Sequence, residues 1–410
     1  MSWKRKLGND WGRLGMMSEW RTIRAADFID FNPRLNLKKG AITTKVAMDK
    51  LKPFTKKIPE TEKAEFNGGA KFCNGDTVMA RITPCLENGK TAYVDMLDDG
   101  EIGFGSTEFI VMRAKAGISD PQFVYYTAIN PTFRNVAIKS MVGSSGRQRV
   151  QQSVLEELEL SVPGLDEQRR IGAFLAELDE KIALNNKIND NLEQQAQAIY
   201  HERFETVSPN DLPSDWRIVT LGEVATISNK SFNPLKEPEI LLEHYSIPAF
   251  DEARFPVFEL STSIKSNKFI IDASCFMISK LNPTTKRVWK PYCLTGNAVC
   301  STEFIVYKAK DQSITDFLYS VIDSGSFSDF MCSHVTGSTG SRQRTTPSDT
   351  LSYELILPSE DELAEFQSLV SPMYAQMRIN AIENDKLKRL RDSLLPKLMS
   401  GEIDVSAVQL

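Results

Sequence analysis

Residues 166–204 are the segment that most restricts the fold of this chain. They run for 39 residues without a proline and with one glycine, Gly172. Apolar residues recur at alternating steps of four and three, so the seam positions of a seven-residue repeat are Ile171, Leu175, Leu178, Ile182, Asn185, Asn189, Leu192, Ala196 and Ile199. On a helix this repeat makes one narrow apolar seam, which needs a partner helix. At about 1.5 Å per residue the helix would be roughly 58 Å long, more than a small domain can enclose.

The partner helix is predicted in the same chain, because residues 361–403 repeat the pattern after a shift of 195 residues. Its seam positions are Phe366, Val370, Met373, Met377, Asn380, Asn384, Leu387 and Leu394. Arg391 interrupts the seam, and Pro372 either kinks this helix or marks its start.

Asparagines occupy the same seam positions in both copies. We interpret Asn185, Asn189, Asn380 and Asn384 as buried polar residues that fix the register of an intramolecular antiparallel coiled coil at a cost in stability. The alternative is that they mark a weak polar stretch of the seam.

The repeat extends beyond the helices. Ser106–Val111 is identical to Ser301–Val306, and Arg147–Arg149 matches Arg342–Arg344, each at an offset of 195. Chance does not hold one offset over about 100 residues, so the chain is an internal duplication. Two long repeats predict a pseudo-twofold arrangement, because a solenoid would need at least three repeats.

Each copy is expected to hold a mixed α/β domain followed by one of the two long helices. The predicted boundaries are a tail at 1–17, domains at 18–158 and 211–350, and spacer helices at 159–210 and 351–410. Strands are predicted at 78–82, 109–112 and 304–307. A helix is predicted after Asp120-Pro121, and a capping box at Ser359 and Glu362 opens the second long helix.

The two copies differ most at residues 24–100 and 220–297, which match only with gaps. A protein whose halves bind two different targets on a common frame would have this pattern.

Charge is distributed unevenly along the chain. Residues 1–150 carry 24 basic and 16 acidic side chains, a net charge of +8, whereas residues 151–210 carry −7, 211–350 carry −2 and 351–410 carry −4. Because local fields steer polyanions, a pI of about 5.6 does not exclude DNA. No apolar run approaches the roughly 20 residues that span a bilayer, and the N-terminus lacks a secretory signal, so a cytoplasmic location is expected. Six scattered cysteines and three histidines predict no metal site.

Several segments together resemble the specificity subunit of type I restriction-modification systems. They are residues 75–84 through Glu87–Lys90, the loop at 143–149, Val162-Pro163 with Glu167–Ile171, and the closing stretch 394–403. The second copy departs from the pattern, since Glu362-Leu363 replaces Glu167-Gln168 and Asp272-Ala273 replaces the Gly-Asp turn.

The resemblance implies two target-recognition domains that each read one half of an asymmetric, two-part site in double-stranded DNA, with the helices setting the gap. It implies methylation subunits docked on the helical rod and motor-nuclease subunits in the full complex. S-adenosylmethionine, ATP and Mg²⁺ would then belong to partner subunits, with adenine as the methylated base and no cofactor in this chain.

The sequence itself contains no pattern for catalysis. It has no phosphate-binding Gly-rich loop with Lys-Ser/Thr, no Asp/Asn-Pro-Pro-aromatic motif of an amino-methyltransferase, and no nucleophile elbow. We therefore predict a non-catalytic subunit.

Candidate DNA contacts follow from residue type. The two Arg-Gln-Arg segments offer guanidinium groups for phosphate or guanine and an amide for adenine. We favour phosphate contact, and the alternative is that the arginines brace the loop. Arg81 and Lys280 are matched cations in the variable part, and Lys90 is a further basic candidate. The predicted set is Arg81, Lys90, Arg147, Gln148, Arg149, Lys280, Arg342, Gln343 and Arg344.

Two other functions remain open at this stage. One is the specificity component of a methylation-only or other split restriction system, and the other is a duplicated coiled-coil scaffold that binds only proteins. The basic first half and the unlike variable segments favour DNA.

Overall fold

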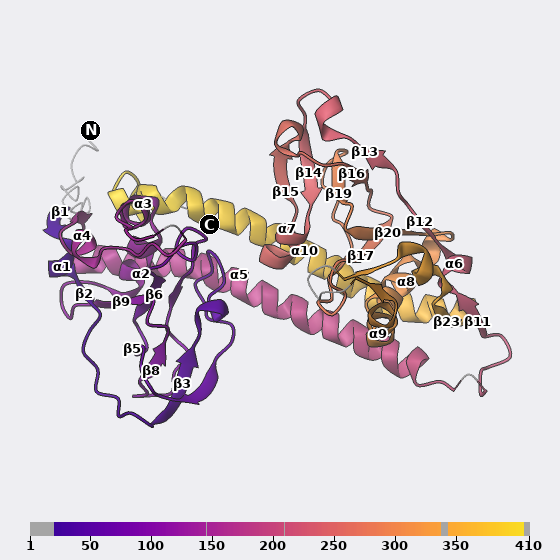
Figure 1. Cartoon of the computed structure of the whole chain (residues 1–410), viewed down its shortest axis with the longest axis horizontal. Coiled ribbons are helices and arrows are strands. Elements are labelled where there is room, and N and C mark those ends of the chain that lie inside the picture. The colour runs from indigo at the N-terminus through magenta and orange to yellow at the C-terminus, as the bar shows by residue number, and fades with distance from the viewer. Residues whose placement is uncertain (1–19, 145, 209, 338–342, 406–410) are drawn as a thin grey trace, which may run out of the picture. The chain divides into compact units, whose positions relative to one another are not determined.

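The computed structural model describes residues 20–144, 146–208, 210–337 and 343–405 (Figure 1). The predicted tail at 1–17 and the candidate Arg342 lie outside these ranges. The chain divides into two compact units: unit 1 comprises Met1–Ala183 with Lys386–Leu410, and unit 2 comprises Leu184–Asp385. Two long helices, α5 (Leu165–Tyr200) and α10 (Glu360–Ser400), each contribute one part to unit 1 and the other part to unit 2.

The described part of unit 1 that precedes α5 contains ten strands and four short helices. The strands are β1 (Arg21–Arg24), β2 (Ile29–Phe31), β3 (Ile42–Val46), β4 (Glu62–Glu65), β5 (Ala70–Phe72), β6 (Thr77–Ala80), β7 (Thr91–Tyr93), β8 (Gly103–Gly105), β9 (Phe109–Ala114) and β10 (Glu159–Val162). The helices are α1 (Ala25–Phe28), α2 (Pro121–Ile129), α3 (Pro131–Lys139) and α4 (Gln152–Glu156).

Two four-stranded sheets make up most of unit 1. The antiparallel sheet has the order β2-β9-β6-β7, and the second sheet has the order β4-β3-β8-β5 with one parallel pair, β3 and β8. In Figure 1 the second sheet lies farther from α5 than β6 and β9 do. Val46, Phe72, Val78, Phe109 and Val111 are buried in one core between strands of the two sheets.

The described part of unit 2 contains the strands from β11 onward and four short helices. The strands are β11 (Arg217–Thr220), β12 (Ala225–Ile227), β13 (Ser231–Phe232), β14 (Leu241–Tyr245), β15 (Val257–Leu260), β16 (Lys268–Ile270), β17 (Cys275–Ser279), β18 (Val288–Trp289), β19 (Ala298–Ser301), β20 (Phe304–Ala309), β21 (Val335–Thr336), β22 (Arg344–Thr345) and β23 (Glu354–Leu357). The helices are α6 (Leu221–Val224), α7 (Ile247–Ala253), α8 (Thr315–Ile322) and α9 (Gly325–Ser333).

The sheets of unit 2 have the same strand order as those of unit 1. The antiparallel sheet is β12-β20-β17-β18. The second sheet is β13-β16-β19-β14-β15, whose parallel pair is β14 and β19, and β13 is an additional edge strand. The segments that align only with gaps therefore share one topology, which sequence comparison of the two copies did not detect.

Several local predictions are confirmed. The predicted strands correspond to β6, β9 and β20, and the helix after Asp120 is α2, whose first turn is capped by the Asp120 carboxylate accepting from the backbone N–H groups of Gln122 and Phe123. The Ser359 hydroxyl accepts from the N–H of Glu362 at the start of α10. Pro372 does not mark the start of this helix, because α10 begins at Glu360 and continues through it.

The predicted seam residues of α5 and α10 are all buried or half-buried. In unit 1, Ile171 and Leu175 of α5 share a core with Leu395 and Leu398 of α10. In unit 2, Tyr200 and Phe204 pack against Phe317 and Phe366. The predicted mixed α/β class with two long helices is therefore confirmed. Among the residues that the structure describes, no helix is long and apolar enough to cross a membrane.

Candidate nucleic-acid interface

The same ion pair is present at matched positions of the two units. In unit 1 the Arg149 guanidinium donates to both carboxylate oxygens of Glu108, with Nε–Oε2 at 2.9 Å and Nη2–Oε1 at 2.6 Å. In unit 2 Arg344 donates to Glu303, with Nε–Oε2 at 3.0 Å and Nη2–Oε1 at 3.1 Å. Two parallel hydrogen bonds fix the orientation of a guanidinium group. The last arginine of each Arg-Gln-Arg segment is therefore tied to the glutamate of the repeated Ser-Thr-Glu-Phe segment.

The ion pair stabilises the charged forms of both partners and shifts their pKa values accordingly. Hydrogen bonds from Arg149 hold the pKa of Glu108 below its ordinary value, and the charge of Arg81 acts in the same direction. The Glu108 hydrogen bond in turn raises the pKa of Arg149, and Glu303 does the same for Arg344. Both carboxylates were absent from the predicted site. Their occurrence within an identical segment of both copies was the signal that could have identified them.

Backbone hydrogen bonds hold Gln148-Arg149 in unit 1 and Gln343-Arg344 in unit 2 against the loop that follows a central strand. In unit 1 the N–H of Thr83 donates to the carbonyl of Gln148 at 3.0 Å, and in unit 2 the N–H of Asn282 donates to the carbonyl of Gln343 at 2.9 Å. Isolated bridges join Ile82 to Arg149 and Leu281 to Arg344. The two loops therefore form one continuous edge in each unit.

Arg147 differs from Arg149 in its surroundings. Its side chain is exposed, and Gln148 beside it is half-buried. Gly143 has φ +136°, and a Cβ there would lie 2.9 Å from the carbonyl oxygen of Arg147, so the turn requires glycine. These contacts favour bracing for Arg149 and Arg344, whereas Arg147 presents its guanidinium to solvent.

The predicted cations Arg81 and Lys280 also occupy matched places. The backbone N–H of each donates to the carbonyl of the matched glutamate, Glu108 or Glu303, at 2.9 Å. The Arg81 Nε lies 3.4 Å from the Glu108 carboxylate, so Arg81 and Arg149 converge on one acid. Lys90 points elsewhere, because its ammonium donates to the carbonyl of Met48 at 2.9 Å.

A cavity of about 670 Å³ opens beside Arg81 in unit 1. It is also lined by two further cations, Arg34 and Lys71, and by the hydroxyl residue Thr107. The Lys71 ammonium donates to the carbonyl of Leu35, which fixes it at the wall. No carboxylate residue is among the lining residues in the described part of unit 1, so the cavity suits an anion. Sequence reasoning missed Arg34 and Lys71, because only the folding of the second sheet brings them near Arg81.

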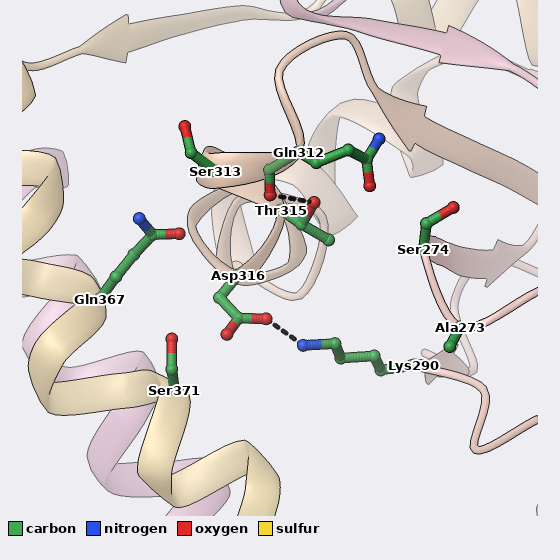
Figure 2. A pocket seen from close by; sticks show the side chains of 9 residues that line it. All are labelled: Ala273, Ser274, Lys290, Gln312, Ser313, Thr315, Asp316, Gln367 and Ser371. Carbon is green, nitrogen blue, oxygen red and sulfur yellow. Dashed lines mark hydrogen bonds and ion pairs between the residues drawn. The ribbon is translucent and has the colours of Figure 1, made fainter.

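Unit 2 has a smaller hollow of a different character. It measures about 380 Å³ and lies where α8, α10 and the turn before β17 meet. Figure 2 shows Gln367 and Ser371 extending from α10, and the Lys290 ammonium paired with the Asp316 carboxylate. Because its cation is already neutralised by Asp316, this hollow offers hydrogen bonds rather than net charge.

The seam asparagines contact one another within unit 2. The Asn185 amide donates to Asn384 at 2.9 Å, and the Asn380 amide donates to Asn189 at 2.8 Å. Asn185 and Asn380 are buried. These pairs run in opposite directions along α5 and α10, so the two helices are antiparallel in this unit. Within the described ranges, no cluster of three or more His, Cys, Asp or Glu residues could hold a metal ion.

Comparisons with known proteins show what this chain is similar to. Residues 17–194 match the family model of the type I restriction modification DNA specificity domain. The HindI specificity subunit of Haemophilus influenzae is 24% identical over 80% of this chain and 86% of its own length. The EcoAI specificity subunit of Escherichia coli is 35% identical, but the match covers 32% of this chain and only 20% of that protein.

A solved structure agrees on the fold. The type I restriction-modification S subunit from M. genitalium aligns with a TM-score of 0.55 and 17% identity, covering 97% of this chain and 99% of that one. These comparisons support the resemblance inferred from the sequence: residues 17–194 match the DNA specificity domain, and most of the chain is similar to type I specificity subunits.

Proposed function

We propose that this chain recognises a two-part, asymmetric sequence in double-stranded DNA, with unit 1 reading one half-site and unit 2 the other. Methylation subunits bound to the long helices would modify adenine, and motor-nuclease subunits would join them for cleavage. The chain itself would carry no cofactor, and S-adenosylmethionine, ATP and Mg²⁺ would act in the partner subunits.

One observation supports this proposal most directly. The two units share an arginine–glutamate ion pair, but the residues next to that pair differ. Both units hold the Arg-Gln-Arg edge through the same glutamate contact. Beside that edge, unit 1 has a cavity lined by three cations, whereas in unit 2 the matched cation is Lys280 and the second sheet has an additional edge strand, β13. Phosphate contacts position a protein on DNA and base contacts specify sequence, so a common edge with different neighbours fits two different half-sites.

The arginines of unit 1 differ in whether a carboxylate holds the guanidinium or the side chain is exposed to solvent. Arg149 is engaged by Glu108, whereas Arg34 and Arg147 have exposed side chains. Exposed guanidinium groups can reach phosphate oxygens at little desolvation cost. We therefore assign Arg34 and Arg147 to the DNA backbone, and the remaining lining of the cavity around Arg81 to base or groove contact.

Selection from a random DNA pool tests the proposal. The chain is reconstituted with its methylation subunit and incubated with duplexes of random sequence, and bound DNA is sequenced over several rounds. We expect two short conserved sequences at a fixed spacing. Enrichment of no sequence would contradict the proposal and favour a protein-binding scaffold. Assembly with a nuclease subunit in a cleavage assay distinguishes a full restriction system from a methylation-only one.

A further inference from the structure

The loop formed by residues 281–287, here called the unit 2 edge loop, is held in place by an unusual ion pair. It carries the bridge from Leu281 to Arg344 and the hydrogen bond from Asn282 to Gln343, so it forms the edge proposed to face DNA. At its far end the Lys286 ammonium donates to the backbone carbonyl of Asp323 at 2.7 Å and lies 2.9 Å from the carboxylate of the same residue.

Asp323 is buried in an environment that disfavours its charge. The residue is 1% exposed and follows the last turn of α8, and neither carboxylate oxygen has a hydrogen-bond partner that meets strict geometry. Lys286 is its ion-pair partner and is itself 42% exposed at the side chain. If the carboxylate loses its charge, the ammonium keeps the backbone carbonyl of Asp323 as its acceptor, and water competes with that single hydrogen bond.

The groups that face Asp323 come from each element packed around it. Lys286 of the edge loop and Arg254, which caps α7, favour the ionised carboxylate. Glu193 of α5 disfavours it, and the hydroxyls of Tyr319 in α8 and Tyr374 in α10 lie within its field. Desolvation by burial outweighs the cations and raises the pKa of Asp323 to about 6.

Unit 1 holds the corresponding loop without an acid. Arg134 of α3 donates to the backbone carbonyls of Leu86 and Glu87, at 3.2 and 2.6 Å. Carbonyl groups do not titrate, and arginine keeps its charge at every pH used for proteins. At an offset of 195 from Asp323, unit 1 has Ala128, which is buried.

We propose that Lys286 and Asp323 form an acid-sensitive anchor for the unit 2 edge loop, so that mild acid weakens reading of the unit 2 half-site while the unit 1 half-site stays bound. This inference rests on the proposed function, because it assumes that each unit reads one half-site. It makes Asp323 a positioning residue that acts through Lys286 and touches no DNA.

The effect of pH on folding stability distinguishes release of the loop from unfolding of unit 2. A carboxyl whose folded-state pKa lies above its unfolded value binds the proton more tightly in the folded state. The contribution of Asp323 to stability therefore rises as the pH falls through about 6. Acid that releases the loop does not destabilise unit 2 through this group.

The test repeats the random-pool selection with the reconstituted complex at pH 7.5 and at pH 5.5. For the wild-type chain we expect sequence preference at one half-site to fall about fourfold at pH 5.5, because a carboxyl with a pKa of about 6 is then only about one quarter ionised, while the other half-site is unchanged. The variant D323N should show the weakened half-site already at pH 7.5 and no further response to acid.

A second variant of the same ion pair and a control variant keep the test valid if D323N fails to fold. K286M removes the same pair from the exposed side and should give the same loss at both pH values. The control is D272N, which removes an exposed carboxylate paired with Lys308 outside the edge loop and should keep the acid response of the wild type.

The possible failures are distinguishable. Equal fading of both half-sites at pH 5.5, or a normal acid response in D323N or K286M, would overturn the anchor and leave the proposed function intact. Absence of any selected sequence at pH 7.5 would instead contradict the proposed function. Melting temperatures measured at both pH values establish that unit 2 remains folded.

Discussion

At the scale of single residues, the two arginines of one short segment have different surroundings although they are chemically identical. Arg149 is oriented by two hydrogen bonds to Glu108, whereas Arg147 is exposed two residues earlier. A guanidinium that is hydrogen-bonded to a carboxylate binds phosphate weakly, because the two anions compete for the same donors. Within one segment, Arg149 therefore stabilises the loop, whereas Arg147 can contact phosphate.

Replacing Arg147 by alanine is expected to weaken binding to target and non-target DNA about equally. Phosphate is the same in every sequence, so the log–log dependence of the binding constant on salt should flatten by about 0.9 for one lost contact. Titrations of the reconstituted complex at several salt concentrations measure this slope. The matched control is R169A, since Arg169 is an exposed arginine on α5.

The same measurement on R149A separates bracing from gripping. Loss of the Glu108 pair should lower the melting temperature of the chain, and the salt slope should change less than in R147A. A base-specific loss at one half-site with an unchanged slope in R147A would show that Arg147 reads a base instead.

Arg391, which interrupts the predicted seam, is accounted for by a buried partner. Its guanidinium donates to Asp179 of α5 at 2.5 Å, both side chains are 6% exposed, and the hydroxyl of Tyr126 also donates to Asp179. A charged residue at a seam position is tolerated when an opposite charge meets it there. The interruption is thus a buried ion pair inside unit 1.

R391L is expected to destabilise unit 1 by about 3–5 kcal/mol, because it leaves the Asp179 carboxylate buried without its cation. The double variant D179L/R391L should recover most of this loss, since apolar side chains of similar size suit the seam. Urea unfolding followed by circular dichroism measures both. Equal losses in the single and double variants would mean that packing, rather than charge, determines the cost.

At the scale of elements, four asparagines form hydrogen bonds between the two long helices. The asparagine pairs on α5 and α10 satisfy one another in unit 2, through the contacts of Asn185 with Asn384 and of Asn380 with Asn189. A shift of one helix by one heptad would place these amides against Met377 and Met373 in one direction, and against Arg391 and Leu387 in the other. We therefore expect the asparagine pairs to favour the observed register over these two.

We predict that the two helices set the gap between the half-sites. Seven residues inserted in α5 between Asn189 and Leu192, and seven in α10 between Met377 and Asn380, preserve the seam and add about 10.5 Å. That length corresponds to roughly three base-pair steps at about 3.4 Å.

Random-pool selection should then return the same half-site sequences with a longer gap. Circular dichroism establishes that the inserted variant is folded. Altered half-site bases at the original gap would contradict a spacer role for the helices.

At the scale of the whole molecule, charge is segregated along the chain. Residues 1–150 carry a net charge of +8, and residues 211–350 carry −2. A basic surface increases the electrostatic part of DNA binding and its dependence on salt. Under the proposed function, the half-site read by unit 1 should account for more of the salt dependence than the half-site read by unit 2.

The purified chain alone should transfer no methyl group to DNA, since its sequence has no donor-binding or amino-methyltransferase motif. Sequence-specific methylation should arise only when the methylation subunit is added. Incorporation of labelled methyl groups from S-adenosylmethionine measures this, with the methylation subunit alone as the control. Transfer by the isolated chain, free of contaminating enzyme, would refute a non-catalytic role.

The sequence by itself determined the features that depend on neighbouring residues. Helix periodicity, the Asp120 cap and the strand at Phe109 arise from local spacing, so α2, α5, α10 and β9 were predicted within a few residues. The duplication was visible because identical segments recur at one offset. Glu108 and Glu303 lie in segments that are identical in the two copies, and this identity could have marked them as important residues.

Only the tertiary structure decided what distant residues do together. The parallel pairing of β14 with β19 joins residues more than fifty positions apart, and no local pattern encodes such a partner. The Lys90 ammonium donates to the carbonyl of Met48 across 42 positions, and Lys286 meets Asp323 across 37 positions. Side-chain charge can be read from a sequence, whereas the group that neutralises it depends on which elements the fold brings into contact.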